Sequence, residues 1–475
     1  MHNAPVSFEK QPTSEPLRTS YVWLICCSAA MGGLLFGYDW VVIGGAKPFY
    51  EKFFNLTSEQ LIGWANSCAL LGCLLGSVVS GWASDRFGRK RLLISSAVIF
   101  AVSSAFTATA AMFGAFVFWR IAGGVAIGMA SNVSPNYIAE VSPAAWRGRL
   151  VSLNQLTIVI GILAAQIVNW LIAEKVPSGA TAEMIRNSWN GQMGWRWMFG
   201  AVVVPSFVFL GAVLAVPESP RWLMKQGRVS EARAVLEKIG GASYALGVIT
   251  EASGTVTPEH DGKPGFSELF SHGVFSALVI GVGLAVLQQW SGINVIFNYA
   301  EEIYRSAGYG VSDILFNIVI TGTVNLIFTL LALTFVDKFG RRPLMLLGCA
   351  GVGISHFLIG LAYKLQVGGL PVLIFTLCTI GCYAMSLAPV TWVLISEMFP
   401  NRVRGLAISV SVSALWLSSF FLTFTFPIIS RTLGSAGTFW LYAGICLLGF
   451  FFILVRVPET KGKSLEQIER ELLAK

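Results

Sequence analysis

Two charged residues lie inside otherwise apolar runs of this sequence. Asp39 lies near the end of the run at about 21–45, and Arg120 lies near the start of the run at about 114–138. An unpaired charge in an apolar interior costs a few kcal/mol, so the two residues are candidate partners. A neighbouring guanidinium lowers the pKa of a carboxyl group and burial raises it, so the proton affinity of Asp39 can change with conformation. The pair is therefore either a functional site or a structural ion pair.

Amide side chains form a second candidate site. Gln288 and Gln289 are adjacent, and Asn294 follows beside a glycine in the apolar run at about 274–298. An amide both donates and accepts hydrogen bonds without the desolvation cost of a charge. A single amide in an apolar helix often only bridges two helices. Three of them in one run indicate a ligand-binding site instead.

The composition excludes an ordinary water-soluble protein. Apolar residues make up 55% of the 475 residues and charged residues 12%, about half the usual globular fraction of roughly 25%. The net charge of +8 is not concentrated in a basic soluble domain, so no nucleic-acid partner is expected. The eight cysteines and four histidines form no metal-binding pattern. Without a nucleophile or a phosphate loop either, we expect no enzyme, no metal and no cofactor.

The apolar runs form two sets of six, separated by a polar stretch. They lie at about 21–45, 61–83, 92–112, 114–138, 150–173 and 197–216, and then at about 274–298, 311–336, 343–364, 369–396, 404–427 and 434–456. Each is long enough to cross a bilayer as a helix. We expect an all-α membrane protein with a tail over 1–20, a six-helix half over 21–216, a helical linker over 217–272, a second half over 273–456 and a tail over 457–475.

The positions of Lys and Arg predict the orientation in the membrane. Loops after odd-numbered runs hold eight of these residues, including Lys47 and Lys52, whereas loops after even-numbered runs hold seventeen. Because cytoplasmic loops collect Lys and Arg, we expect the even-numbered loops and both termini on the cytoplasmic side. At 1.5 Å per helical residue, Asp39 and Arg120 then both lie roughly 9 Å below the outer surface.

Three polar loops repeat between the two halves. GWASDRFGRKR at 81–91 corresponds to FVDKFGRRP at 335–343, YIAEVSPAAWRG at 137–148 to LISEMFPNRVRG at 394–405, and VPESPRWL at 216–223 to VPETKGKSL at 457–465. The near-constant offset indicates two halves descended from one unit. The charged residues form either a cytoplasmic latch or simply a signal for orientation. The candidate gating residues are Asp85, Arg86, Arg89, Glu140, Arg147, Glu218, Arg221, Asp337, Arg341, Glu397 and Arg404.

These loops, with GGLLFGYD at 32–39, QQWSGIN at 288–294 and PETKG at 458–462, resemble the sugar porter branch of the major facilitator superfamily, and especially bacterial proton-coupled xylose symporters. The resemblance covers all twelve runs. It implies twelve transmembrane helices in two pseudo-symmetric halves with a short cytoplasmic helical linker, and a monosaccharide site between the halves. The residues that match the family's sugar-binding positions, or offer aromatic faces beside them, are Phe36, Gln155, Gln288, Gln289, Asn294, Asn325, Trp392 and Trp416.

Three positions depart from the xylose symporter pattern. Asn298 replaces the first Tyr of a pair whose second member is Tyr299, Leu415 replaces an amide, and Ala388 replaces a glycine. The changes at Asn298 and Leu415 remove a phenol and an amide that could form hydrogen bonds with a sugar. The amide of Asn298 restores one such partner. The sugar, a pentose such as xylose or a hexose, stays open at this point.

Asp39 occupies the position that is a carboxylate in the proton symporters of this family. The resemblance therefore implies a secondary active transporter that imports a monosaccharide with a proton by alternating access. Two alternatives are a uniporter, in which Asp39 and Arg120 are structural, and a sugar sensor, which would need longer tails. We expect a monomer in the plasma membrane, most simply a bacterial inner membrane, with sugar, proton and lipid bilayer as its partners.

Overall fold

The computed structural model describes residues 17–461 except 178, 255–265, 272–273 and 401–402. Most of the two predicted tails therefore lies outside the described residues. The described part of the chain is helical and contains no strand. This is the architecture that a bilayer imposes, because a helix satisfies its backbone hydrogen bonds within itself.

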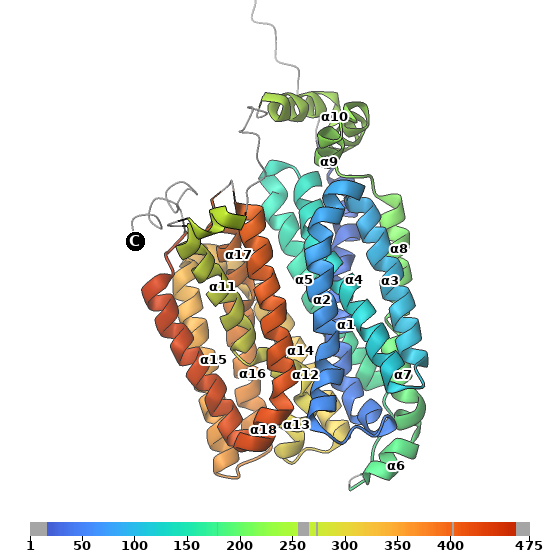
Figure 1. Cartoon of the computed structure of the whole chain (residues 1–475), viewed down its shortest axis with the longest axis vertical. Coiled ribbons are helices and arrows are strands. Elements are labelled where there is room, and N and C mark those ends of the chain that lie inside the picture. The colour runs from blue at the N-terminus through green and yellow to red at the C-terminus, as the bar shows by residue number, and fades with distance from the viewer. Residues whose placement is uncertain (1–16, 178, 255–265, 272–273, 401–402, 462–475) are drawn as a thin grey trace, which may run out of the picture.

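The helices form two bundles side by side (Figure 1). The first contains α1 (Thr19–Phe53), α2 (Glu59–Phe87), α3 (Arg89–Thr109), α4 (Phe113–Val141) and α5 (Arg147–Ile172), then the short α6 (Ala182–Asn187), α7 (Trp195–Gly200) and α8 (Val203–Ala215). The second contains α11 (Val274–Trp290), α12 (Ile293–Asn298), α13 (Ala300–Ser306), α14 (Val311–Phe339), α15 (Arg341–Lys364), α16 (Leu370–Met385), α17 (Leu387–Glu397) and α18 (Arg404–Arg456).

Twelve spans are present, although eleven described helices are long and apolar enough to cross a membrane. The difference comes from α18, whose 53 residues would measure about 80 Å as one straight helix, far more than a bilayer. Gly434 interrupts it with a left-handed φ of 67°, so α18 consists of two spans joined at this residue. This is the arrangement of twelve transmembrane helices in two halves that the sequence predicts.

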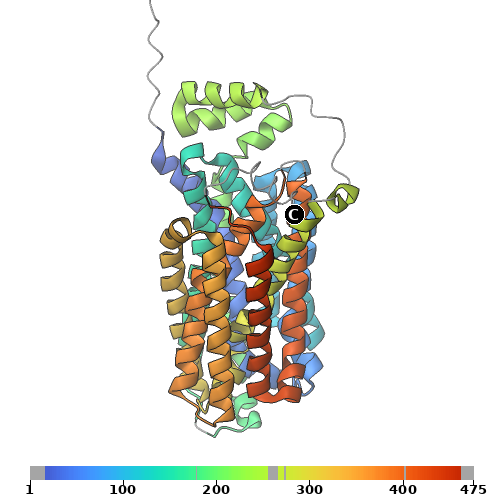
Figure 2. The ribbon, with the colours of Figure 1, turned by 90° about the vertical axis from the view of Figure 1, so that its left-hand side faces the viewer.

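The linker between the bundles contains α9 (Pro220–Lys225) and α10 (Val229–Gly254). Both lie beyond one end of the bundles, where α10 runs across the bundle axis (Figures 1 and 2). We call this end the linker face. The other end, where α6 and α13 lie, is the distal face.

The first helix is longer than its apolar run. The sequence predicts a span ending near residue 45 followed by a loop with Lys47 and Lys52, but α1 continues to Phe53. The prediction was wrong because a hydropathy window ends at the first charges, whereas Lys47 is buried beside Glu51 of its own helix and two glutamates that lie far away in the sequence. Glu51 is buried in the same helix, so Asp39 is not the only acid within the first span.

The repeated loops have the same structure in both halves. Gly88 separates α2 from α3 with a φ of 95°, and Gly340 separates α14 from α15 with a φ of 88°. The carboxylate of Glu218 accepts hydrogen bonds from the N–H groups of Arg89 and Lys90, at 3.0 and 3.1 Å. A negative charge at the start of a helix stabilises its unpaired N–H groups and its dipole.

The second half repeats this arrangement with Glu459. Its carboxylate accepts hydrogen bonds from the N–H groups of Arg341 and Arg342, at 3.0 and 3.1 Å. Burial acts to raise the pKa of Glu459, but the N–H groups of Lys461, Arg341, Arg342 and Thr460 outweigh it and lower the pKa overall. The carboxylate is therefore ionised at neutral pH, as a helix cap of this kind requires.

The two turn glycines are expected to resist substitution. A Cβ at Gly340 would lie 2.7 Å from a carboxylate oxygen of Glu459, and the left-handed backbone is strained for alanine. We expect Gly340→Ala, and Gly88→Ala at the equivalent turn, each to lower the free energy of unfolding by about 1–3 kcal/mol. The measurement is the thermal unfolding midpoint in detergent. Gly81→Ala is the control, because this helical glycine has open space beside it; equal midpoints for the three variants would contradict the expectation.

Candidate functional site

Asp39 and Arg120 form a buried ion pair, as the depth argument predicts. Nη1 of Arg120 lies 2.9 Å from each carboxylate oxygen of Asp39, and Nη2 donates to the backbone carbonyl of Asp39 at 3.4 Å. Each residue is 3% exposed. The guanidinium also lies 5.2 Å from the centre of the Phe199 ring. Helices α1 and α4 are thus joined by a charge pair shielded from solvent, where protonation of Asp39 would remove the main partner of Arg120.

The seventh span, which is the first of the second half, is interrupted between Trp290 and Ile293. Helix α11 ends at Trp290, Gly292 adopts a left-handed φ of 87°, and α12 begins at Ile293. The break is held by His356 of α15, whose Nε2–H donates to the carbonyl of Ser291 at 2.8 Å. A Cβ at Gly292 would lie 3.0 Å from His356 Nε2, so only glycine fits here without displacing the ring.

The predicted amide cluster lies at this break. Gln288 donates to the carbonyls of Leu387 and Ala388, at 3.1 and 3.2 Å, beside the junction of α16 and α17. Gln289 donates to the side-chain oxygen of Gln288 at 3.3 Å. Asn294 in turn donates to Gln289 and, at 3.0 Å, to the hydroxyl of Ser419 in α18. The three amides therefore form one chain of hydrogen bonds that links the seventh, tenth and eleventh spans.

Several buried polar atoms around this chain have no hydrogen-bond partner among the described residues. They include Oδ1 of Asn294, Oδ1 of Asn298 and Nε1 of Trp416. The ring of Trp416 lies 5.7 Å from that of Phe36, which belongs to the first half. Acceptors, a donor and apolar ring faces are therefore collected between the halves. This set suits a ligand that carries both hydroxyls and C–H faces.

The other predicted site residues make no side-chain hydrogen bond to this chain within the described residues. Gln155 is half-buried on α5 and Asn325 is buried on α14, and neither has a side-chain hydrogen bond within the described residues. Trp392 lies on α17 with 38% of its surface exposed. The structure also adds two residues that the sequence did not indicate. Both amide atoms of Gln166 and Nε1 of Trp40 are buried without a partner in the described part of the chain.

Several of the gating residues form ion pairs within their own half at the linker face. Arg89 contacts Glu140 at 2.9 Å and Asp85 at 3.3 Å. In the second half, Arg341 contacts Glu397 at 3.2 Å. Arg147 and Arg404 donate to backbone carbonyls of their own halves at 3.1 Å. Arg86 and Arg221 are exposed, and Asp337 belongs to the last turns of α14.

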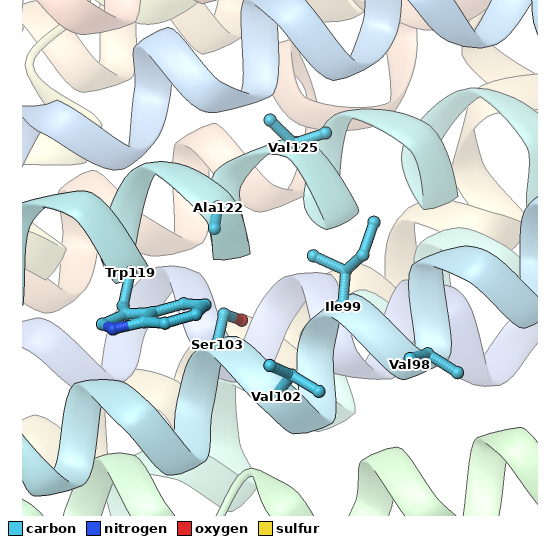
Figure 3. A pocket seen from close by; sticks show the side chains of 7 residues that line it. All are labelled: Val98, Ile99, Val102, Ser103, Trp119, Ala122 and Val125. Carbon is cyan, nitrogen blue, oxygen red and sulfur yellow. The ribbon is translucent and has the colours of Figure 1, made fainter.

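A cavity of about 380 Å³ lies between α3 and α4, away from the amide chain (Figure 3). Its lining is apolar except for the hydroxyl of Ser103, and it includes Trp119 and the valines Val98, Val102 and Val125. Val98 and Val102 are exposed on the outside of the bundle. The cavity offers too few hydrogen-bond partners for a polar ligand, so the site between the halves remains the better candidate.

The chain matches known proteins over almost its whole length. The family described as "Sugar (and other) transporter" matches residues 25–472. The D-xylose-proton symporter of Escherichia coli (strain K12) is 38% identical over 95% of this chain and 96% of its own. The glucose transport protein of Synechocystis is 41% identical over 96% of this chain and 99% of its own. The inward-open structure of the xylose transporter from E. coli is 36% identical, with a TM-score of 0.81 over 95% of this chain and 99% of that chain.

Removing one partner of the buried ion pair should destabilise the protein strongly, whereas removing both charges should destabilise it little. Arg120→Leu leaves the Asp39 charge buried without its partner, so we expect a loss of about 3–5 kcal/mol in the free energy of unfolding. The double variant Asp39→Asn, Arg120→Leu should recover most of this loss. Thermal unfolding in detergent measures both. Arg431→Leu, which breaks an exposed pair with Glu59, is the control and should change little. If the double variant is less stable than Arg120→Leu alone, the pair does not act as described.

Proposed function

This chain belongs to the sugar transporter family, within the major facilitator superfamily, and we propose that it imports a monosaccharide together with a proton by alternating access. The observation that carries the proposal is the ion pair of Asp39 and Arg120, buried between two helices of the first half. A relative named as a D-xylose-proton symporter supports proton coupling. Another relative is named as an arabinose-proton symporter, in Bacillus subtilis, and is 37% identical over 99% of both chains.

The sugar is proposed to bind between the halves, at the break in the seventh span. Gln288, Gln289 and Asn294 supply amides from the second half, while Phe36 and Trp416 supply ring faces. Sugar hydroxyls both donate and accept hydrogen bonds, so they can pair with Asn294 Oδ1, Asn298 Oδ1 and Trp416 Nε1. Gln155, Asn325 and Trp392 are proposed to join the site when the halves close around the sugar.

The proton is proposed to bind at Asp39. While Asp39 is ionised, the Arg120 guanidinium ties α1 to α4 through both carboxylate oxygens. A proton from outside removes the charge attraction, so α1 is free to rearrange around bound sugar. On the inner side the proton leaves and the pair forms again. The conformation thereby sets the proton affinity of Asp39, and this dependence couples the two substrates.

The linker face is proposed to be cytoplasmic, with both termini on that side, in a bacterial inner membrane. The loops at this face collect Lys and Arg, as cytoplasmic loops do. The ion pairs of Arg89 with Glu140 and of Arg341 with Glu397 each join elements of one half, so they are proposed to keep each half rigid. When the linker face closes, the same charged residues are available to pair across the halves, which is the proposed latch. The protein is proposed to work as a monomer.

Proton coupling is tested by Asp39→Asn in liposomes. We expect sugar-driven proton uptake to fall to the level of protein-free liposomes, because the amide cannot exchange a proton at neutral pH. Exchange of labelled sugar across the membrane should persist, since it needs no net proton movement. D-Xylose and D-glucose are the probes. Concentrative uptake that is unchanged in the variant would place proton coupling at another group. A wild-type protein without sugar-driven proton uptake would instead be a uniporter, with Asp39 and Arg120 structural.

The sugar site is tested by Gln288→Ala. This variant removes the amide at the base of the hydrogen-bond chain and should weaken sugar binding by roughly tenfold or more, the cost of one or two lost polar contacts. Sugar-dependent tryptophan fluorescence measures the affinity. Gln60→Ala, which truncates an exposed amide at the start of α2, is the control. Equal affinity in Gln288→Ala and the control would place the sugar elsewhere.

A further inference from the structure

A cluster of charges joins the two halves at the distal face. Lys47 of α1 is 1% exposed, and its Nζ lies 2.8 Å from Glu51 of the same helix. It also lies 3.6 Å from Glu301 and forms an ion pair with Glu302, both on α13 of the other half. The mechanism proposed above does not use any of these residues. We call Lys47, Glu51, Glu301 and Glu302 the distal cluster.

The distal cluster carries more negative than positive charge. Three carboxylates surround Lys47, and within the described residues one further cation, Arg305, is in direct contact and pairs with Glu301. The side chains of Glu51 and Glu301 are buried, whereas that of Glu302 is 33% exposed. Oε2 of Glu302 is itself buried and has no hydrogen-bond partner among the described residues. Because its side chain is the most exposed of the three, Glu302 is the carboxylate least shielded from solvent at the distal face.

The halves touch closely beside the distal cluster. Gly44 lies one turn before Lys47, and a Cβ at this position would overlap the backbone carbonyl of Phe297 in α12. Helix α1 can approach α12 only because residue 44 has no side chain. Any opening of the distal face must separate these helices, and it must then also separate Lys47 from Glu301 and Glu302.

We propose that the distal cluster is a proton-responsive lock on the external entrance, which Lys47 holds closed and which a proton on Glu302 strengthens. The proposal rests on the proposed function for its orientation, with the distal face outside. The proton on Glu302 follows a different path from the proton proposed to bind Asp39. Glu302 takes its proton from the external solution and returns it to the same side, so this proton is not transported.

Electrostatics gives the sign of the pH effect. Closure brings Glu301 and Glu302 of α13 together toward Glu51 of α1, and three carboxylates repel one another unless one is neutral. In the closed structure, burial and these carboxylates raise the pKa of Glu302 to about 8 from its ordinary 4.5, although Lys47 pulls the pKa down. At an external pH between 4.5 and about 8, Glu302 therefore takes up a proton when the distal face closes. Closure becomes more favourable as the external pH falls through this range. The titratable and charged groups facing Glu302 are Lys47, Tyr50, Glu51, Tyr299 and Glu301.

A distance measurement across the distal face tests the lock without any transport. Spin labels are attached at Met184→Cys in α6 and Leu365→Cys after α15, two exposed positions in opposite halves. The exposed Cys27 and Cys378 are replaced by serine. Distances are recorded in nanodiscs without sugar at pH 5 to 8.5. The Asp39→Asn background excludes titration of Asp39, so a failure of the lock and a failure of proton coupling are distinguishable.

The closed-to-open ratio should rise as pH falls from 8, by at most about tenfold per pH unit, the limit for one proton. Glu302→Gln should stay closed at every pH, because the amide mimics the protonated acid. Lys47→Met should shift the distances toward the open form. Glu59→Gln is the matched control, because it neutralises a partly exposed carboxylate that pairs with Arg431 across the halves, and it should keep the wild-type pH dependence.

Two results would overturn the lock. The first is a distance distribution independent of pH in the Asp39→Asn background, or one whose pH dependence survives in Glu302→Gln. The second is a Lys47→Met variant that is as closed as the parent. Should Lys47→Met not yield folded protein, as judged by gel filtration, the charge exchange Lys47→Glu with Glu302→Lys replaces it. This exchange restores an opposite-charge pair across the halves and should restore closure, so an open double variant would also contradict the proposal.

Discussion

Charge in an apolar bundle must be paired within the protein, and this constraint organises the molecule. Asp39 and Arg120 satisfy it inside the first half through two contacts of 2.9 Å. Lys47 satisfies it across the halves with carboxylates from α1 and α13. Because an unpaired partner is expensive in this environment, neither pair can change without a change in helix packing. A proton can therefore alter the conformation at these positions, whereas it would do little to an ion pair on a solvated surface.

The ligand site depends on a related constraint on the backbone. An unbroken helix leaves its N–H and C=O groups fully paired, so it offers only side chains to a ligand. The breaks after Trp290 and at Ser386 interrupt the seventh and tenth spans, and Gln288 pairs with the carbonyls released near the second break. His356 holds the first break through the carbonyl of Ser291. The amides are thus placed by backbone irregularities that other spans stabilise.

Internal symmetry is visible at the level of single contacts. Gly88 with Glu218 and Gly340 with Glu459 form the same junction, in which a left-handed glycine leaves room for a carboxylate over the next helix start. The distal cluster is built differently, because Lys47 of the first half contacts carboxylates of the second half. The repeated junctions stabilise each half by itself, whereas the distal cluster acts between them. Such a division of roles suits two rigid halves that move relative to each other.

The sequence alone determined the number and order of the spans, the two related halves, the pairing of Asp39 with Arg120 and the grouping of the amides. These follow from hydropathy, repeat spacing and depth, which are local properties of the chain. Only the tertiary structure decided that Lys47 is buried in a helix, that Glu459 caps α15, and that Gln166 packs against Gly322 of α14. Each of these depends on the rotation and approach of helices that lie far apart in the sequence. A hydropathy window averages over neighbours along one segment, so it cannot register the partner that makes a buried charge or amide stable.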